Sequence, residues 1–304
     1  RLVRSWELQN KRELVAYAGF PRTDAGKISG RDEYEYDIAV YSQPFNDHWR
    51  VYAGLGYWTG DYPDDGYNDS ETRYALGVQY RARQLTLNAQ LNLNDIDKTR
   101  FAASVFGAWT IDDHWSIPFG FSSDSQEVPL AARRHGVTGT GTELGFRYWW
   151  NELRSLYFLG KYVDFDDGNV KTSVQMGLHQ RVMTTPNHKI DAWVDAYYAA
   201  NTIDPADAPY WAPKSQYEFG VTFDYAWRTW QKYEKSFTQH FIVGGGVFWQ
   251  QDYGSDFVWR LGYQHEWNIS EEFNLLYGYE KVHRYYDGDP EDQFRLYVRL
   301  WWRF

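Results

Sequence analysis

The last stretch of the chain, 294–304, alternates strictly between two kinds of side chain. The apolar set is Phe294, Leu296, Val298, Leu300, Trp302 and Phe304, and the residues between them are Arg295, Tyr297, Arg299, Trp301 and Arg303. Because successive side chains of a strand point to opposite faces, this pattern predicts a β-strand with one wholly apolar face. A soluble enzyme rarely ends in such a strand with an aromatic residue at the terminal carboxylate, so the pattern constrains the solvent as well as the fold.

A tail of this kind is typical of outer-membrane β-barrels, whose last strand closes the barrel and whose terminal Phe helps mark the chain for membrane assembly. The composition agrees, because 16 Trp, 26 Tyr and 18 Phe occur in a chain whose mean hydropathy of -0.68 is that of a polar protein. An apolar outer band, aromatic girdles and a wet interior account for both properties. A soluble β-sandwich or carbohydrate-binding module remains as an alternative, but its core would favour medium-sized aliphatic side chains.

Segments with a period of two residues follow one another along the chain, with no helical block between them. They span 12–20, 31–43, 48–60, 71–82, 84–94, 99–110, 115–122, 139–150, 154–164, 170–182, 189–200, 216–228, 238–250, 256–267, 272–285 and 293–304. The sequence leaves the register of 12–20 and 154–164 ambiguous. An even number of strands brings both termini to one side, as in bacterial barrels. We therefore predict an all-β fold, a single antiparallel transmembrane β-barrel of about 16 strands over 1–304, in the bacterial outer membrane.

The connections between these segments alternate in character. Tight ones at 45–48, 111–114, 151–153, 184–187 and 268–271 predict periplasmic turns, whereas mostly longer ones at 21–30, 61–70, 123–136, 201–214, 251–255 and 286–292 predict external loops. One tight connection is irregular, and 229–236 reads as a short periplasmic helix or a long turn. An Asp-His-Trp repeat at 47–49 and 113–115 predicts a Trp at the membrane interface where the next strand starts.

The two faces of the predicted strands differ in chemistry. Rows such as Trp49, Val51, Ala53, Leu55 and Tyr57, or Leu85, Leu87, Ala89, Leu91 and Leu93, carry no charge and are expected to face lipid. The opposite face carries acids and interleaved aromatics, and we take these residues as the candidate cargo path: Glu33, Glu35, Asp37, Asp191, Trp193, Asp195, Tyr197, Glu218, Asp224 and Glu266. Aromatic rings offer flat apolar surface to sugar rings, while carboxylates attract cations and accept hydrogen bonds from hydroxyl groups.

Several chemistries find no support in the sequence. Cysteine is absent, the eight histidines lack the spacing of a zinc site, and neither a GxSxG elbow nor a phosphate loop followed by a helix occurs. We therefore expect no enzyme, no cofactor and no metal site, and an outer-membrane lipid-modifying enzyme is the disfavoured alternative. The net charge of -10 argues against nucleic acid and favours a cationic partner. The acidic loops suit solvated surface or divalent-cation bridges to lipopolysaccharide as well as a cargo exit.

Three segments carry a resemblance to a known family. Asp47–Trp58, Val243–Gln250 and Phe294–Phe304 resemble the PgaA family of outer-membrane porins, and the likeness runs along essentially the whole chain. The resemblance implies export of the biofilm polysaccharide poly-β-1,6-N-acetyl-D-glucosamine, in a partly deacetylated and therefore partly cationic form. It also implies that the chain is the excised C-terminal barrel of a longer protein, in agreement with the lack of a signal peptide at Arg1–Trp6. The N-terminal part of that protein would be a tetratricopeptide-repeat domain, which is absent here. That domain would bring a periplasmic deacetylase as partner.

No short motif of that family marks its cargo residues, so the ten candidates rest on alternation. A general diffusion porin stays open as an alternative, because Arg260, Arg295 and Arg299 on late strands would face acids elsewhere across the lumen. An export channel for another exopolysaccharide is a further alternative.

Overall fold

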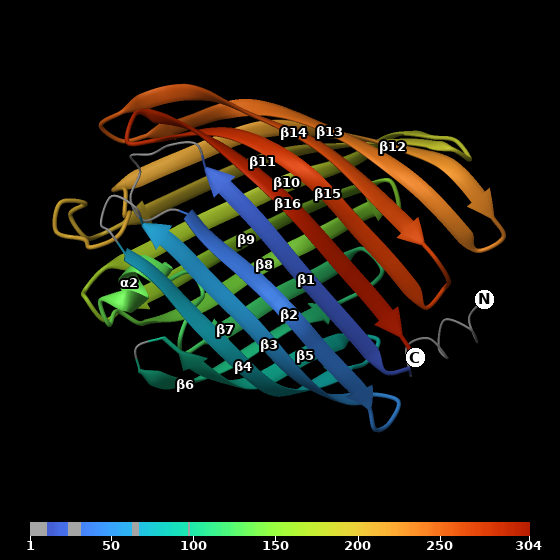
Figure 1. Ribbon diagram of the computed structural model, residues 1–304, viewed down its shortest axis with the longest axis horizontal. Helices are drawn as coiled ribbons and strands as arrows, with labels where there is room; N and C mark the ends of the chain where they lie inside the picture. Colours follow the sequence, from blue (N-terminus) through green and yellow to red (C-terminus); the bar gives the residue numbers. More distant parts are fainter. Residues whose placement is uncertain (1–10, 24–31, 63–66, 97) are drawn as a thin grey trace.

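The computed structural model describes residues 11–23, 32–62, 67–96 and 98–304, and leaves out the side chains of 20–39 and 61–68. Its strands are β1 (Glu13–Thr23), β2 (Asp32–Pro44), β3 (Trp49–Tyr62), β4 (Tyr67–Arg81), β5 (Leu85–Asp95), β6 (Thr99–Thr110), β7 (Trp115–Ser122), β8 (Gly139–Asn151), β9 (Arg154–Phe165), β10 (Val170–Thr184), β11 (His188–Asn201), β12 (Ser215–Lys232), β13 (Lys235–Gln250), β14 (Gly254–Asn268), β15 (Phe273–Tyr286) and β16 (Asp289–Arg303). Each strand pairs with its neighbours in the sequence, and β1 pairs with β16, which closes the barrel (Figure 1). The predicted antiparallel barrel of sixteen strands is confirmed.

The closing seam runs along the whole length of β1. Its register pairs Glu13 with Arg303 and Thr23 with Gln293. The seam ends in two backbone hydrogen bonds, in which Arg12 N lies 3.1 Å from Phe304 O and Phe304 N lies 3.0 Å from Arg12 O. A closed barrel leaves no strand edge exposed to lipid, where an unpaired backbone group has no water to bind. The terminal alternating strand therefore closes the barrel, as predicted.

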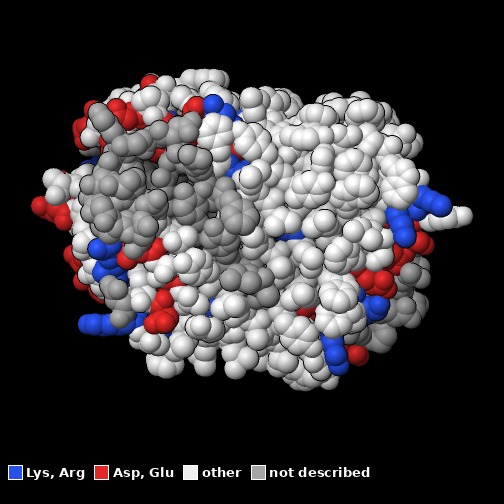
Figure 2. Space-filling model, in the orientation of Figure 1, with Lys and Arg blue, Asp and Glu red and all other residues white. Residues whose placement is uncertain are grey.

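The outer face of the barrel is apolar. Leu91, Phe101, Phe257 and Leu261 are 67%, 86%, 62% and 50% exposed, and all of them lie on the outside of their strands. Lys, Arg, Asp and Glu gather toward the two ends on the face seen in Figure 2, and the band between them is mostly uncharged. Since a charge at the bilayer midplane costs roughly 2–4 kcal/mol for Lys or Arg, this band fits the hydrocarbon core.

The structure resolves the two registers that the sequence left ambiguous. In β1, Tyr17 faces the lumen and its hydroxyl contacts the guanidinium of Arg295 on β16. In β9, Tyr157 and Lys161 face the lumen, because they contact Asp195 on β11 and Glu127 in the connection after β7. Odd-numbered residues therefore point inward in both strands.

The two Asp-His-Trp repeats form the same turn. Asn46 Oδ1 accepts hydrogen bonds from the backbone N–H groups of His48 and Trp49 at 2.9 and 2.8 Å. In the second turn Asp112 Oδ1 accepts from His114 and Trp115 at 2.7 and 2.8 Å, and these bonds lower the pKa of Asp112.

Each of these turns is followed at once by an aromatic pair. The ring of Trp49 lies 5.0 Å from that of Tyr80, and the ring of Trp115 lies 4.6 Å from that of Tyr148. The repeat is thus a side-chain-capped turn joined to an aromatic anchor, and each Trp begins a strand as predicted.

The expectation for 229–236 was wrong. β12 and β13 extend through this region, and only Tyr233 and Glu234 separate Lys232 from Lys235. Tyr233 has a φ of 55°, which the tight turn of a two-residue hairpin requires. A bulge between Arg228 and Trp230 shifts the register just before the turn, which hides the strand pattern in the sequence.

Candidate functional site

The connection 123–138 between β7 and β8, hereafter the lumen loop, folds into the barrel instead of standing outside it as predicted. It carries the helix α2 (Leu130–Arg134), seen inside the ring of strands in Figure 1. The helix contacts β3 and β4, although β5 and β6 lie between β4 and β7 in the barrel wall. A segment that skips two strands must cross the lumen, so the loop narrows the bore near its extracellular end. The loop is anchored by apolar side chains, since Val128, Leu130 and Ala132 are each 0% exposed. Their apolar character is the signal in the sequence that could have indicated burial.

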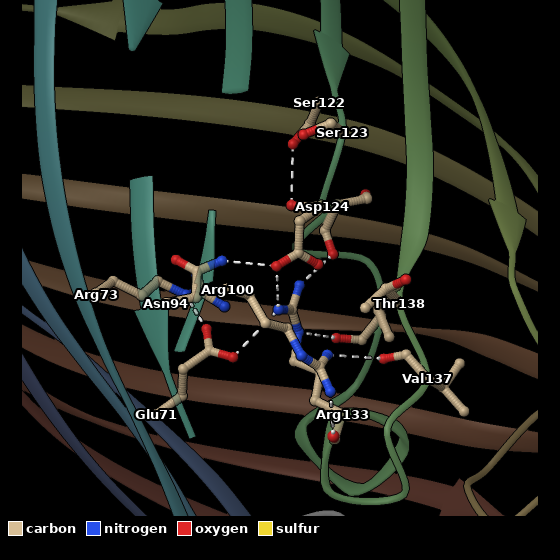
Figure 3. Close-up of polar contacts among 12 residues, drawn as sticks. Glu71, Arg73, Asn94, Arg100, Ser122, Ser123, Asp124, Arg133, Val137 and Thr138 are labelled. Carbon is tan, nitrogen blue, oxygen red and sulfur yellow. Dashed lines mark hydrogen bonds and ion pairs between the residues drawn. The ribbon is translucent and has the colours of Figure 1, made fainter. Parts of the chain in front are cut away.

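Arg133 of α2 fixes the lumen loop to the barrel wall. Its side chain is 1% exposed, and its Nη1 lies 2.9 Å from Asp124 Oδ2 and 3.1 Å from Glu71 Oε2 (Figure 3). Its other nitrogens donate to the carbonyl groups of Ser125 and Val128 at 2.6 and 3.1 Å. A buried charge is tolerated only when it is paired and hydrogen-bonded, and this guanidinium is both. We call Arg133, Glu71 and Asp124 the latch.

A second tie joins the lumen loop to the other side of the barrel. Glu127 Oε1 lies 2.6 Å from Lys161 Nζ on β9, and Oε2 lies 2.9 Å from Lys171 Nζ on β10. Burial raises the pKa of Glu127, but the ammonium groups of Lys171 and Lys161 outweigh burial and lower this pKa to about 2. The loop is therefore held by ion pairs from β4 on one side and from β9 and β10 on the other.

An apolar cluster joins the lumen loop to the connection 202–214 between β11 and β12. It consists of Val128, Ala131, Ala132, Val137, Val163, Phe165, Tyr210 and Ala212. The rings of Phe165 and Tyr210 stack at 5.7 Å, and the Tyr210 hydroxyl donates to Asp167 Oδ2 at 2.8 Å. Burial raises the pKa of Tyr210, so the hydroxyl stays protonated and keeps its role as a donor. The two loops thus close over a shared core at the extracellular end.

Seven of the ten predicted cargo residues lie on one wall of the lumen, formed by β11, β12 and β14. They are Asp191, Trp193, Asp195, Tyr197, Glu218, Asp224 and Glu266, and we call them the acidic wall. The register of β11 and β12 places Asp191 opposite Asp224 and Tyr197 opposite Glu218. Glu33, Glu35 and Asp37 lie in β2, opposite Gly60, Trp58 and Gly56 of β3, but their side chains are outside the described part of the structure.

The acids nearest the periplasmic end already have basic partners within the protein. Asp191 receives Arg181 Nε at 2.9 Å and Nη2 at 3.1 Å, and His179 Nε2 lies 2.7 Å from its Oδ1. His240 bridges two further acids, with Nδ1 2.9 Å from Asp224 Oδ2 and Nε2 3.3 Å from Glu266 Oε2. These carboxylates hold the wall together, which the sequence could not indicate without the strand register.

Asp195 and Glu218 differ from their neighbours. Among the described residues, no Lys, Arg or His nitrogen lies within ion-pair distance of either carboxylate. The Tyr157 hydroxyl donates to Asp195 Oδ1 at 3.0 Å, which leaves the negative charge uncompensated. Trp193 and Tyr197 lie beside Asp195 on the same inward row of β11, and the ring of Trp193 is 5.1 Å from that of His179. Asp195 therefore presents an uncompensated charge among aromatic rings, whereas the charge of Glu218 interacts with that of Arg284 on β15.

The described residues contain no group of three or more His, Asp or Glu side chains placed to hold a metal ion. No helix in the described ranges is long and apolar enough to cross a membrane.

Comparison with known proteins identifies the barrel. The family model for the PgaA membrane β-barrel domain matches residues 8–304. The chain belongs to this family. Its resemblance to PgaA, its outer-membrane fold and its location in the bacterial outer membrane are thereby confirmed.

The relatives agree with this assignment. The poly-β-1,6-N-acetyl-D-glucosamine export protein of Escherichia coli strain K12 is 31% identical over 308 residues, which cover 100% of this chain and 37% of that protein. The chain thus spans about a third of the length of the curated relatives it matches. A solved bacterial polysaccharide outer membrane secretin superposes with a TM-score of 0.87 at 28% identity, over 97% of this chain and 99% of that one. The Pseudomonas aeruginosa protein OpdK, solved with vanillate, shares the fold alone, with a TM-score of 0.50 and 12% identity over 97% and 98% of the two chains. The first two relatives are named for polysaccharide export and for a polysaccharide outer membrane secretin, which agrees with the interpretation that the barrel is not an enzyme.

Proposed function

We propose that this barrel exports poly-β-1,6-N-acetyl-D-glucosamine, in a partly deacetylated form, across the bacterial outer membrane. Its membership of the PgaA barrel family carries the proposal, since the curated relative that covers the whole chain is an export protein for this polymer. The acidic wall supports it, because amine groups along a deacetylated chain are cationic and neither Asp195 nor Glu218 forms a close ion pair with another described residue.

The strength of each contact suits a conduit. An exposed amine–carboxylate pair is worth about 0–1 kcal/mol, so each pair breaks easily. Several weak sites together hold a polymer while letting it advance by one unit at a time. Trp193 and Tyr197 add ring faces that contact every sugar unit, whether or not it carries an amine. No cofactor is needed, and synthesis on the inner side would supply the driving force.

The partners follow from the same family. We propose that the barrel is the C-terminal part of a longer protein whose periplasmic tetratricopeptide-repeat domain brings a deacetylase to the entrance. The 37% coverage of the E. coli relative supports a longer protein. We propose further that the acidic external loops contact lipopolysaccharide through divalent cations, while the mostly uncharged band in Figure 2 contacts lipid.

A general diffusion porin is the second candidate, because arginines do face the lumen. Arg260 is paired with Glu280 on the neighbouring strand, and Arg295 contacts the Tyr17 hydroxyl. The Glu280 carboxylate, which is paired with Arg260 and lies opposite Arg295 in the strand register, weakens the field across the bore that a porin constriction would need. The polymer-selective measurement described next separates the two candidates.

The test measures secreted polymer, sorted by degree of acetylation, at matched barrel levels. The variant Asp195→Asn with Glu218→Gln should reduce export of deacetylated polymer more than that of fully acetylated polymer, whereas Trp193→Ala or Tyr197→Ala should slow both alike. Equal loss of both polymers in the double amide variant would refute the electrostatic role, and no loss in any variant would place the cargo path on other strands.

The double variant Asp191→Asn with Asp195→Asn is a useful comparison. Because Asp191 binds Arg181 and His179, its amide should loosen the wall and lower the abundance of folded barrel. Glu218→Gln is therefore a better second substitution beside Asp195→Asn than Asp191→Asn is.

A further inference from the structure

A cavity of about 510 Å³ lies against the lumen loop, on the side of the barrel away from the acidic wall. Its lining includes Trp58, Asn94, Ser104, Phe106 and Asp124, which come from β3, β5, β6 and the lumen loop. Its volume falls in the range of about 300–1,000 Å³ that small-molecule sites occupy.

Three deeply buried polar atoms of the lining have no hydrogen-bond partner within the described protein. They are Asn94 Oδ1, Ser104 Oγ and Asp124 Oδ1, and their residues are 3%, 2% and 8% exposed. The other polar atoms of two of these side chains are occupied, since Asn94 Nδ2 donates to Asp124 Oδ2 at 2.6 Å (Figure 3). Native proteins rarely leave buried polar groups unpaired, and three in one cavity point to a ligand that supplies hydrogen-bond donors.

The charges around the cavity are largely compensated. Asp124 is paired with Arg133, and Glu127 is paired with both Lys161 and Lys171. Glu143 lies opposite Lys161 in the register of β8 and β9, which places a positive charge beside it as well. A cavity with balanced charges gives a cationic unit no advantage, in contrast to the acidic wall.

The remaining lining suits a sugar. Gln90 and Asn92 add amide groups, with Gln90 Nε2 donating to Asn92 Oδ1 at 3.1 Å, while Trp58 and Phe106 add aromatic surface. Amides and hydroxyls that line an apolar-walled cavity match the alternating polar edges and apolar faces of a pyranose ring.

We propose that this cavity is a binding subsite for one uncharged, N-acetylated pyranose unit of the exported polymer. The proposal deepens the export function above and rests on it. Hydroxyl and acetamido N–H groups of the sugar donate to Asn94 Oδ1 and Asp124 Oδ1, and the Ser104 hydroxyl exchanges a hydrogen bond with the ring substituents. The lumen then has two sides, one that holds acetylated units and one that holds units with free amines.

The test compares two probes on the purified protein in nanodiscs: a β-1,6-linked trisaccharide of N-acetylglucosamine, and the same trisaccharide fully deacetylated. Saturation-transfer NMR and calorimetry give the dissociation constants. Ser104→Ala removes a hydroxyl that has no hydrogen-bond partner in the described part of the protein, so the fold should be unaffected. Asn94→Ala removes a second contact, and Asn88→Ala is the matched control, an inward amide of the same strand that lies outside the cavity lining.

The expected result is a rise of about three- to tenfold in the dissociation constant of the acetylated probe for Ser104→Ala and for Asn94→Ala, as the loss of one hydrogen bond predicts. Asn88→Ala should bind as the unaltered protein does, and the deacetylated probe should respond less than twofold to Ser104→Ala. If the unaltered protein fails to bind the acetylated probe, or if Ser104→Ala binds it unchanged, the cavity holds only water and the subsite is refuted.

The export function fails independently of the subsite. A barrel that binds the trisaccharide through Ser104 but passes no polymer into or out of liposomes would refute the export function. A barrel that passes polymer with unchanged Ser104→Ala affinity would refute the subsite alone.

Discussion

Replacing Arg133 by Ala should release the lumen loop, because it breaks a buried ion pair from one side. Glu71 is 0% exposed, so the change leaves a buried carboxylate without one of its two arginine partners. Removing one member of a buried pair costs about 3–5 kcal/mol, and Arg73 still contacts Glu71, so we take about 3 kcal/mol. With ~1.4 kcal/mol for each factor of ten, the population with the loop displaced should rise about a hundredfold.

Single-channel recording in planar bilayers measures this population directly. Arg134→Ala is the matched control on the same helix, because Arg134 forms a partly exposed pair with Asp69 that is worth about 0–1 kcal/mol. Its openings should increase by at most about fivefold. Arg133→Met with Glu71→Leu should restore much of the closed state, since apolar side chains often replace a buried pair without loss. Equal conductance for Arg133→Ala, Arg134→Ala and the unaltered barrel would refute the assignment of the latch.

Three further predictions concern pH, assembly and packing. The pKa of Glu127 is lowered from 4.5 to about 2, so its ionised form stabilises the closed loop by on the order of 3 kcal/mol. This stabilisation should be complete above pH 4.5 and lost as the pH falls toward 2, so that channel openings increase on acidification. An equal increase in Glu127→Gln would contradict this prediction. Deleting Phe304 should lower the amount of heat-modifiable barrel in the outer membrane more than the stability of barrel already folded, and unchanged abundance would count against it. Gly246→Ala should lower the free energy of unfolding in urea by about 1–3 kcal/mol, because the added Cβ meets the backbone of Phe219 and Gly220. Gly220→Ala should unfold like the unaltered barrel, because the atom nearest to its added Cβ is 3.5 Å away. Equal free energies of unfolding for the two variants would disprove the packing argument.

The barrel itself was predictable because its information is local. The two faces of each strand are visible in the sequence as a period of two residues. The tail from Phe294 to Phe304 indicates both that the last strand closes the barrel and that one of its faces contacts lipid. The inward rows placed Asp191, Asp195 and Glu218 on adjacent strands before any register was known. The prediction for 229–236 failed because a bulge in β12 interrupts the two-residue period of the strand.

The lumen loop was not predictable by the same reasoning. Residues 123–138 resemble an external loop because they are mostly polar and include four charged residues, one Pro and one Gly, and only the apolar run Val128–Ala132 hinted at burial. The partners of Arg133 and Glu127 lie on β4, β9 and β10, so these contacts depend on the closed barrel. The pairing of Asp191 with Arg181 likewise depends on register, which a one-residue slip would abolish.

The most direct test of the account is the flux of partly deacetylated polymer through purified barrels in sealed liposomes, with the unaltered barrel and the Arg133→Ala barrel side by side. We predict barrel-dependent passage that is faster for Arg133→Ala, and that weakens both in high salt and in Asp195→Asn with Glu218→Gln. Passage of small sugars of any charge with exclusion of the polymer, in both barrels, would contradict the account and indicate a diffusion porin.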